Sequence, residues 1–426
     1  MRHLYPHFLS NFVFLISPTL WMSFGAVEVS TNSRLGYFKL ALFLSLVGFS
    51  LFPWGDGYER YKVFLDAEFY NLADFLYKGL IQGDIIFSLI AYIVNHVGLS
   101  YQYVQFCFVF LGYNLIFYHL RILLINIRQK ERLFLVFLVL FLVNLIGLAN
   151  NLRYMLATIA FICAISNIEN FNNRGKFILW SIFAGMTHFY VFFLLFIYFI
   201  VSLSAVHLSK SKIKKILFLS IVLSCFSPFI VTTLAPFIKN GDGLIARKFA
   251  SYLLGSDGTI TKMVSSPAQF INHIFKQMPF VILVSYFYFF GDSNCVKVKR
   301  FLLFSSLSFS LVYFFSVYLR VGYFTLLYGV FLLIGAWESY ELKSKWKYAL
   351  LITSFVFFAF NFIYFERMIS RDNLSLLNDN TLCIVASPIF MIDKCSYSDQ
   401  DIYKGNTQFR LLKMESLKRT MEVTGS

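Results

Sequence analysis

The stretch LFLVFLVLFLVNLIGLANNLRYMLATIAFICAI, residues 133–165, decides the fold. The stretch contains the apolar run 133–149 and most of the run 154–168, which are joined by NNLR at 150–153. The two runs lie between the basic tracts RQKER (128–132) and NNRGK (172–176). Apolar runs near this length are typical of membrane-spanning helices. Two spans therefore meet at a turn that carries Arg153.

The whole chain has the composition of a membrane protein. Of its 426 residues 58% are hydrophobic, 20% are aromatic and 14% are charged, and the mean hydropathy is +0.68. A soluble domain carries about a quarter charged residues. We expect an all-α polytopic integral membrane protein with about 11–12 transmembrane helices in residues 1–364. A polar tail, 365–426, follows, and no soluble catalytic domain is expected.

The net charge of +15 is confined to short tracts between the apolar runs. Such Lys/Arg-rich loops mark the cytoplasmic side of a membrane, so the charge does not indicate nucleic-acid binding. Besides RQKER and NNRGK, these tracts are KSKIKK (210–215), KVKR (297–300) and KSKWK (343–347). If all five lie inside, Arg153 lies outside. Two spans between successive inner tracts must meet on the outer side. This predicts an outer loop at 239–269 and places Arg320 at the outer junction of runs 301–319 and 321–337. The tail has balanced charge, which favours the outer side.

Two parts of this topology stay open. The run 177–203 is long for one span and short for two, so it is either one tilted helix or a helix broken at GMTH (185–188), with His188 at the apex. The run 84–99 either crosses, which puts Asp56 inside, or lies as a juxtamembrane helix, which makes 55–83 an outer loop. We favour the broken helix and the juxtamembrane helix.

The candidate site consists of ionisable residues at the outer ends of the runs, where such groups are costly and usually functional. Arginines at that depth suit an anionic ligand such as a lipid diphosphate. His188 and Asp56 are candidates for proton transfer. ARKFASYL (246–253) is either a ligand-binding segment or an interfacial amphipathic helix.

Other chemistry is not indicated by the sequence. There is no P-loop, HExxH, CxxC or GxSxG motif, and no His/carboxylate cluster has metal-ligand spacing, so we expect no cofactor and no metal. Four cysteines lie in or beside spans. Cys383 and Cys395 in the tail could pair if the tail lies in an oxidising compartment.

Four motifs carry a family resemblance: PWGDGYERY (53–61), NNLRYMLATIAF (150–161), RGKFILWSIFAGMTHFYVFFLL (174–195) and LRVGYFTLLYGVFLL (319–333). In order and spacing the chain resembles EpsG-like proteins, membrane polymerases of the broader O-antigen and capsule (Wzy) type. The resemblance matches Asp56, then Arg153 with Ala157, Ala184 with His188, and Arg320 with Tyr323. The chain departs from the pattern in Tyr154, where glutamine is usual, and in the glycines on both sides of Asp56.

The resemblance implies a polymerase of the bacterial inner membrane whose site faces the periplasm or exterior. It would transfer a growing glycan from undecaprenyl diphosphate to an incoming lipid-linked repeat unit. The expected catalytic residues are His188 and Asp56, and the expected diphosphate- and substrate-binding residues are Arg153, Arg320, Arg247, Lys248, Tyr252, Tyr323 and Glu59. The expected partners are the lipid-linked oligosaccharide, the bilayer, a chain-length regulator and a flippase. The alternatives are a GT-C-type glycosyltransferase that uses lipid-phosphate sugars and a flippase for lipid-linked oligosaccharides.

Overall fold

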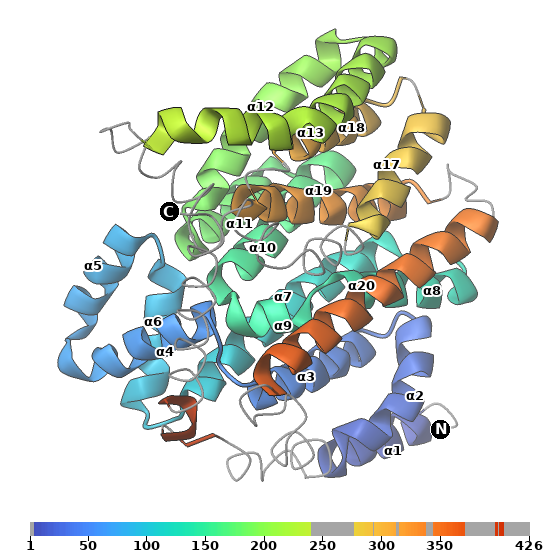
Figure 1. Cartoon of the computed structure of the whole chain (residues 1–426). Helices are drawn as coiled ribbons and strands as arrows, with labels where there is room; N and C mark the ends of the chain where they lie inside the picture. Colours follow the sequence, from blue (N-terminus) through green and yellow to red (C-terminus); the bar gives the residue numbers. More distant parts are fainter. Residues whose placement is uncertain are drawn as a thin grey trace. The chain divides into compact units, whose positions relative to one another are not determined.

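Helices make up every regular element that the computed structural model describes, which covers residues 4–239, 277–292, 294–311, 315–337, 344–370, 397–398 and 400–403. In chain order they are α1 (Leu4–Ile16), α2 (Pro18–Ser30), α3 (Arg34–Ser50), α4 (Asp56–Asp66), η1 (Ala67–Phe69), α5 (Leu72–Gln82), α6 (Ile85–His96), α7 (Tyr101–Leu123), α8 (Gln129–Leu142), α9 (Leu145–Asn150), α10 (Leu152–Phe171), α11 (Arg174–Thr187), α12 (Tyr190–His207), α13 (Lys210–Lys239), α17 (Met278–Phe290), α18 (Val296–Ser310), α19 (Phe315–Gly335) and α20 (Ser344–Ser370) (Figure 1).

The all-α polytopic membrane fold is confirmed. Within the described ranges, four helices are long and apolar enough to cross a membrane: Tyr101–Leu123, Leu152–Phe171, Tyr190–His207 and Lys345–Ile363. The figure of 11–12 spans stays a prediction. The chain forms two units, residues 1–193 with 361–409 (unit 1) and residues 194–360 with 410–426 (unit 2).

In unit 1, α3 and α7 run antiparallel. The Asn32 amide, just before α3, donates to the carbonyl of Arg121 near the end of α7 over 3.1 Å. At the other end of the pair, the rings of Phe49 and Tyr103 lie 5.0 Å apart. The segment 51–100 therefore begins where α3 ends and finishes where α7 begins, both at the same end of the helix pair.

Helix α10 runs parallel to α7, and α11 returns beside it. The Cys163 thiol contacts the Leu115 carbonyl at 3.8 Å, and one turn further on Asn167 and the His119 ring are 2.7 Å apart. Asn172 ends α10 in the left-handed conformation (φ 49°), which asparagine tolerates better than most residues. The turn between α10 and α11 therefore lies at the end of unit 1 where α7 also ends.

That end of unit 1 carries the basic tracts. The Arg132 guanidinium donates to the carbonyls of Leu124 and Ile125, at the end of α7, over 3.0 and 3.2 Å, and to the Ser30 carbonyl over 3.2 Å. A cation suits these exposed carbonyls because the partial charge at a helix C-terminus is negative. RQKER and NNRGK thus share one end of unit 1, and Asp56, Arg153 and His188 belong to the opposite end.

Two local predictions are confirmed. The run near 84–99 forms the short helix α6, whose 12 residues measure about 18 Å, well below the roughly 30 Å of a bilayer core. The run 177–203 is broken, since α11 ends at Thr187 and α12 begins at Tyr190. The segment predicted as an outer loop, 55–83, is largely helical, as α4, η1 and α5.

In unit 2, aromatic rings pack between α18 and α19. The Phe304 ring lies 5.1 Å from Phe324 and 5.9 Å from Tyr328, and Phe301 fills the space above Gly329. The sequence expectation for Arg320 needs correction here. It lies in the second turn of α19 and not between two helices, because arginine is a good helix former and one polar residue does not end a helix.

Candidate functional site

Two glycines set the position of Asp56. Gly55 has φ +62°, a conformation that few other residues adopt, and it turns the chain into α4, whose first residue is Asp56. A Cβ on Gly57 would lie 2.6 Å from the Asn150 side-chain oxygen. That oxygen accepts a 2.8 Å hydrogen bond from the backbone N–H of Trp54. The start of α4 is thereby held against the end of α9, next to Arg153.

Arg153, the second residue of α10, joins two carboxylates. Its guanidinium donates to Asp56 over 3.2 and 3.4 Å, and its other terminal nitrogen donates to Asp84. The Arg153 side chain is 14% exposed and that of Asp56 is 35% exposed, so the Asp56 carboxylate is the more accessible partner.

Asp84 is the buried centre of the group. It lies between α5 and α6, its side chain is 1% exposed, and it also accepts a 3.1 Å bond from Arg60. Arg60, one turn after Asp56 on α4, lies 3.9 Å from the Asp56 carboxylate. We call Asp56, Arg60, Asp84 and Arg153 the charge cluster. Its two acidic and two basic groups balance.

Burial governs the electrostatics of the charge cluster. It raises the pKa of the Asp84 carboxyl above its usual value, while the Arg153 and Arg60 guanidiniums oppose that shift. Burial likewise lowers the pKa of Arg60, and the positive charge of Arg153 adds to the effect. The buried second oxygen of Asp84 accepts no hydrogen bond from the described residues. The ionised form of Asp84 therefore depends on both arginines.

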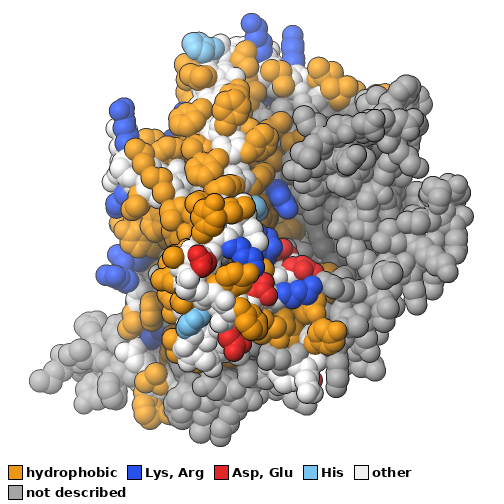
Figure 2. All heavy atoms as spheres, turned by 90° about the vertical axis from the view of Figure 1, so that its left-hand side faces the viewer, with side chains coloured by type: hydrophobic (Ala, Val, Ile, Leu, Met, Phe, Trp, Pro, Cys, Tyr) orange, Lys and Arg blue, Asp and Glu red, His pale blue; other side chains and the backbone are white. Residues whose placement is uncertain are grey.

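The charge cluster has aromatic neighbours. Arg60 lies over the Phe87 ring at 5.8 Å, and the rings of Tyr61 and Phe64 each lie 5.7 Å from that of the buried Tyr101. The face drawn in Figure 2 shows acidic and basic side chains gathered in one area with hydrophobic side chains around them. Apolar neighbours lower the local dielectric and so strengthen the interactions among the charges.

His188 lies in the break between α11 and α12, beside the charge cluster. The next residue, Phe189, packs against Gly83, which precedes Asp84; a Cβ on Gly83 would lie 2.8 Å from the Phe189 ring. Tyr190 contacts the ring of Tyr154, which follows Arg153, at 5.9 Å, and the His188 ring lies 6.3 Å from Tyr190. The residues just after His188 therefore contact Gly83 and Tyr154, which are the sequence neighbours of Asp84 and Arg153.

Of the other candidates from the sequence, only Glu59 belongs to a described part of unit 1. Glu59 is exposed on α4 and pairs with Lys62 at 3.1 Å. Arg320 and Tyr323 lie on α19 in unit 2. Arg247, Lys248, Tyr252, Cys383 and Cys395 lie outside the described residues.

Sequence reasoning missed Arg60 and Asp84. Asp84 directly precedes an apolar run and follows a glycine, so the rule that selected Arg153 would have selected it. Arg60 is recognisable only once 56–66 is known to be a helix, because a spacing of four residues then puts it on the same face as Asp56.

The site combines a partly exposed carboxylate, fixed guanidiniums and a nearby histidine. This set can position an anionic group and accept a proton from a hydroxyl. Among the described residues, no group of three His, Cys, Asp or Glu side chains has metal-binding geometry.

Most of the chain matches a known protein family. The sequence model of the EpsG family matches residues 36–378, which include the charge cluster and His188. No curated protein and no solved structure matches the chain.

Proposed function

The chain belongs to the EpsG family of polysaccharide-polymerase-like membrane proteins, and from this premise we propose that it elongates a bacterial surface polysaccharide. Its donor is a growing glycan on undecaprenyl diphosphate, and its acceptor is an incoming lipid-linked repeat unit. The observation that carries the proposal is the charge cluster with His188 beside it, at the end of unit 1 opposite the basic tracts.

The reaction exchanges one bond at the anomeric carbon of the donor for another. The bond from that carbon to the diphosphate oxygen breaks, and a bond to the acceptor oxygen forms. The acceptor hydroxyl loses its proton to a base, and the leaving group is undecaprenyl diphosphate. The protein must stabilise the charge on the diphosphate and the oxocarbenium character of the sugar.

Each member of the site has a role in this scheme. The Asp56 carboxylate, the most exposed member of the charge cluster, or His188 takes the proton from the acceptor hydroxyl. Arg153 binds the diphosphate, exchanging part of its pairing with Asp56 for the phosphate oxygens. Asp84 and Arg60 hold the Arg153 guanidinium in place. The expectation from the sequence that Arg320 binds the diphosphate stays a prediction.

The arrangement of unit 1 supports a site on the periplasmic or outer side of the inner membrane. Basic tracts mark the cytoplasmic side, and both tracts of unit 1 lie at the end remote from the charge cluster. Tyr397 of the tail lies at the same end as the charge cluster, because its ring contacts Phe52 at 5.2 Å and its carbonyl accepts from Gln102 over 3.4 Å.

Deletion of the coding sequence tests the function, with the cell's surface glycan separated on a gel. Loss of a polymerase leaves single repeat units on the lipid carrier or core, and restoring the wild-type chain restores the ladder. Absence of every repeat unit in the deletion strain would indicate the flippase alternative. A metal requirement together with a monosaccharide donor would indicate the GT-C alternative. Retention of the full ladder in an Asp56→Asn, His188→Gln double variant would refute the proposed site.

A further inference from the structure

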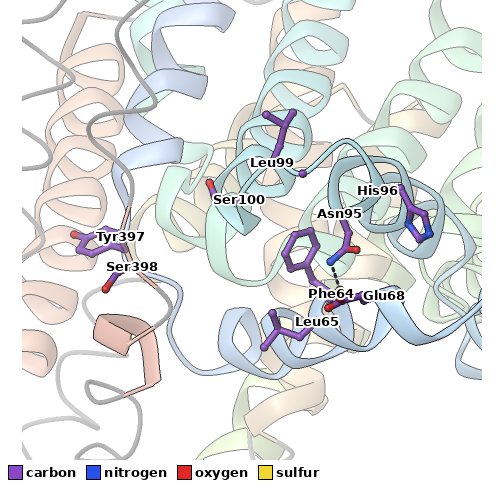
Figure 3. Close-up of a pocket in the computed structure, with 10 residues that line it drawn as sticks. Phe64, Leu65, Glu68, Asn95, His96, Leu99, Ser100, Tyr397 and Ser398 are labelled. Carbon is purple, nitrogen blue, oxygen red and sulfur yellow. Dashed lines mark hydrogen bonds between the residues drawn. The ribbon is translucent and has the colours of Figure 1, made fainter.

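Unit 1 has an open pocket of about 660 Å³ at the far ends of α4 and α6 (Figure 3). It is lined by Phe64, Leu65, Glu68, Asn95, His96 and Tyr397, among others. The described part of the lining combines aromatic rings with amide, carboxylate, imidazole and hydroxyl groups and contains no lysine or arginine. This chemistry suits uncharged or amino-substituted sugars, which offer hydroxyls for hydrogen bonds and an apolar ring face.

The polar groups of the pocket are held in position by the fold. The Asn95 side-chain N–H donates to the Phe64 carbonyl over 3.1 Å, which leaves the amide oxygen as an acceptor at the pocket (Figure 3). The His96 ring stacks on Tyr92 with centroids 3.8 Å apart, and one of its nitrogens contacts the Tyr92 carbonyl. The hydroxyl of Ser100 is buried and has no hydrogen-bond partner among the described residues.

Helices α4 and α6 connect the pocket to the charge cluster. Both begin at the charge cluster, with Asp56 and Asp84, and their far ends meet where Asn95 bonds to Phe64. Asn95 follows Asp84 by 11 positions, which corresponds to a rise of about 16 Å along α6. The pocket is therefore separated from the reacting groups by the length of a short oligosaccharide.

We infer that this pocket binds sugar residues of the growing chain, several units from the bond that reacts. The inference rests on the proposed function. A basic lining would be expected if the pocket held the acceptor's own diphosphate, and none of the lining residues that the structure describes is a lysine or an arginine. A donor of a single repeat is too short to gain much from the pocket, whereas a longer donor fills it. The pocket therefore promotes continued elongation more than the first coupling.

Leu65→Trp tests the inference by filling the pocket, with Phe69→Trp as the control, because Phe69 is also an exposed apolar residue of this segment but does not line the pocket. A Glu68→Ala, His96→Ala double variant removes hydrogen-bonding groups without adding bulk. Each lost hydrogen bond should weaken glycan binding roughly five- to tenfold. Both pocket variants should make shorter chains while the first coupling of two repeats continues at the wild-type rate.

Binding is measured separately with glycan oligomers released by mild acid from the host's own polysaccharide. Saturation-transfer NMR on the full-length protein in nanodiscs should show weaker binding of long oligomers to both pocket variants than to Phe69→Trp. Chains of wild-type length together with unchanged binding would overturn the inference and leave the proposed function intact. Absence of elongation by the wild-type chain would instead count against the proposed function.

Discussion

Asp84→Asn is the sharpest perturbation of the charge cluster, because it removes one negative charge and preserves the shape of the side chain. Asp84 is 1% exposed and accepts hydrogen bonds from both Arg60 and Arg153. Its side chain does not cap α6, so the helix start is not altered. The substitution leaves two guanidiniums, 15% and 14% exposed, to share Asp56.

The expected cost is about 3 kcal/mol, the lower end of the range for breaking a buried ion pair, because Asp56 still compensates part of the charge. For a unit of this size each kcal/mol lowers the melting temperature by roughly 2 °C, so the loss should be about 6 °C. Chain elongation should also fall, because Arg153 loses the partner that fixes its guanidinium.

The assay is thermal unfolding of the purified protein in detergent, read by intrinsic fluorescence, together with the surface-glycan ladder. Asp66→Asn is the control, since Asp66 pairs with Lys78 at 3.2 Å on the surface, where such a bridge contributes at most about 1 kcal/mol. Adding Arg60→Gln to Asp84→Asn restores the charge balance and should recover part of the lost stability. A melting temperature within about 1 °C of wild type for Asp84→Asn, with a normal ladder, would refute the role given to the charge cluster.

Three further predictions concern Arg153, the start of α4 and the metal requirement. Arg153→Lys should reduce elongation at least about tenfold, because lysine cannot bridge two carboxylates and a phosphate, and initial rates on lipid-linked repeats would measure this; an unchanged rate would contradict it. Gly57→Ala should destabilise the protein by about 2 kcal/mol, since its Cβ would lie 2.6 Å from the Asn150 oxygen; a wild-type melting temperature would show that the Asn150 contact is unimportant. Elongation should persist in excess EDTA, and its loss with recovery on adding Mg²⁺ or Mn²⁺ would favour a metal-dependent transferase.

The sequence predicts the helical membrane fold and part of the site because polar and ionisable groups are costly in a membrane. Ionisable residues at the ends of apolar runs are costly, so Asp56 and Arg153 are conspicuous from their positions in the sequence. The break at His188 is predictable because 177–203 fits neither one span nor two. The two glycines beside Asp56, a departure from the family pattern, are explained by the turn at Gly55 and by the contact of Gly57 with Asn150.

The rest of the site depends on tertiary contacts that no local pattern encodes. Arg60 joins the charge cluster only because 56–66 is helical, and Asp84 joins it only because α5 returns the chain to the start of α10. For Arg320 the local pattern itself is misleading. A dip in hydropathy resembles a break between helices, yet α19 continues through it. No sequence pattern predicts the pocket, because Tyr397 reaches it from the tail.

The most direct test of the account is polymerisation by the purified full-length protein in nanodiscs, supplied with lipid-linked repeat units alone. The account predicts a ladder of lengthening chains and release of one undecaprenyl diphosphate for each bond formed, both abolished in the Asp56→Asn, His188→Gln double variant. Failure of the wild-type protein to elongate, together with movement of lipid-linked units across vesicle membranes that contain it, would contradict the account.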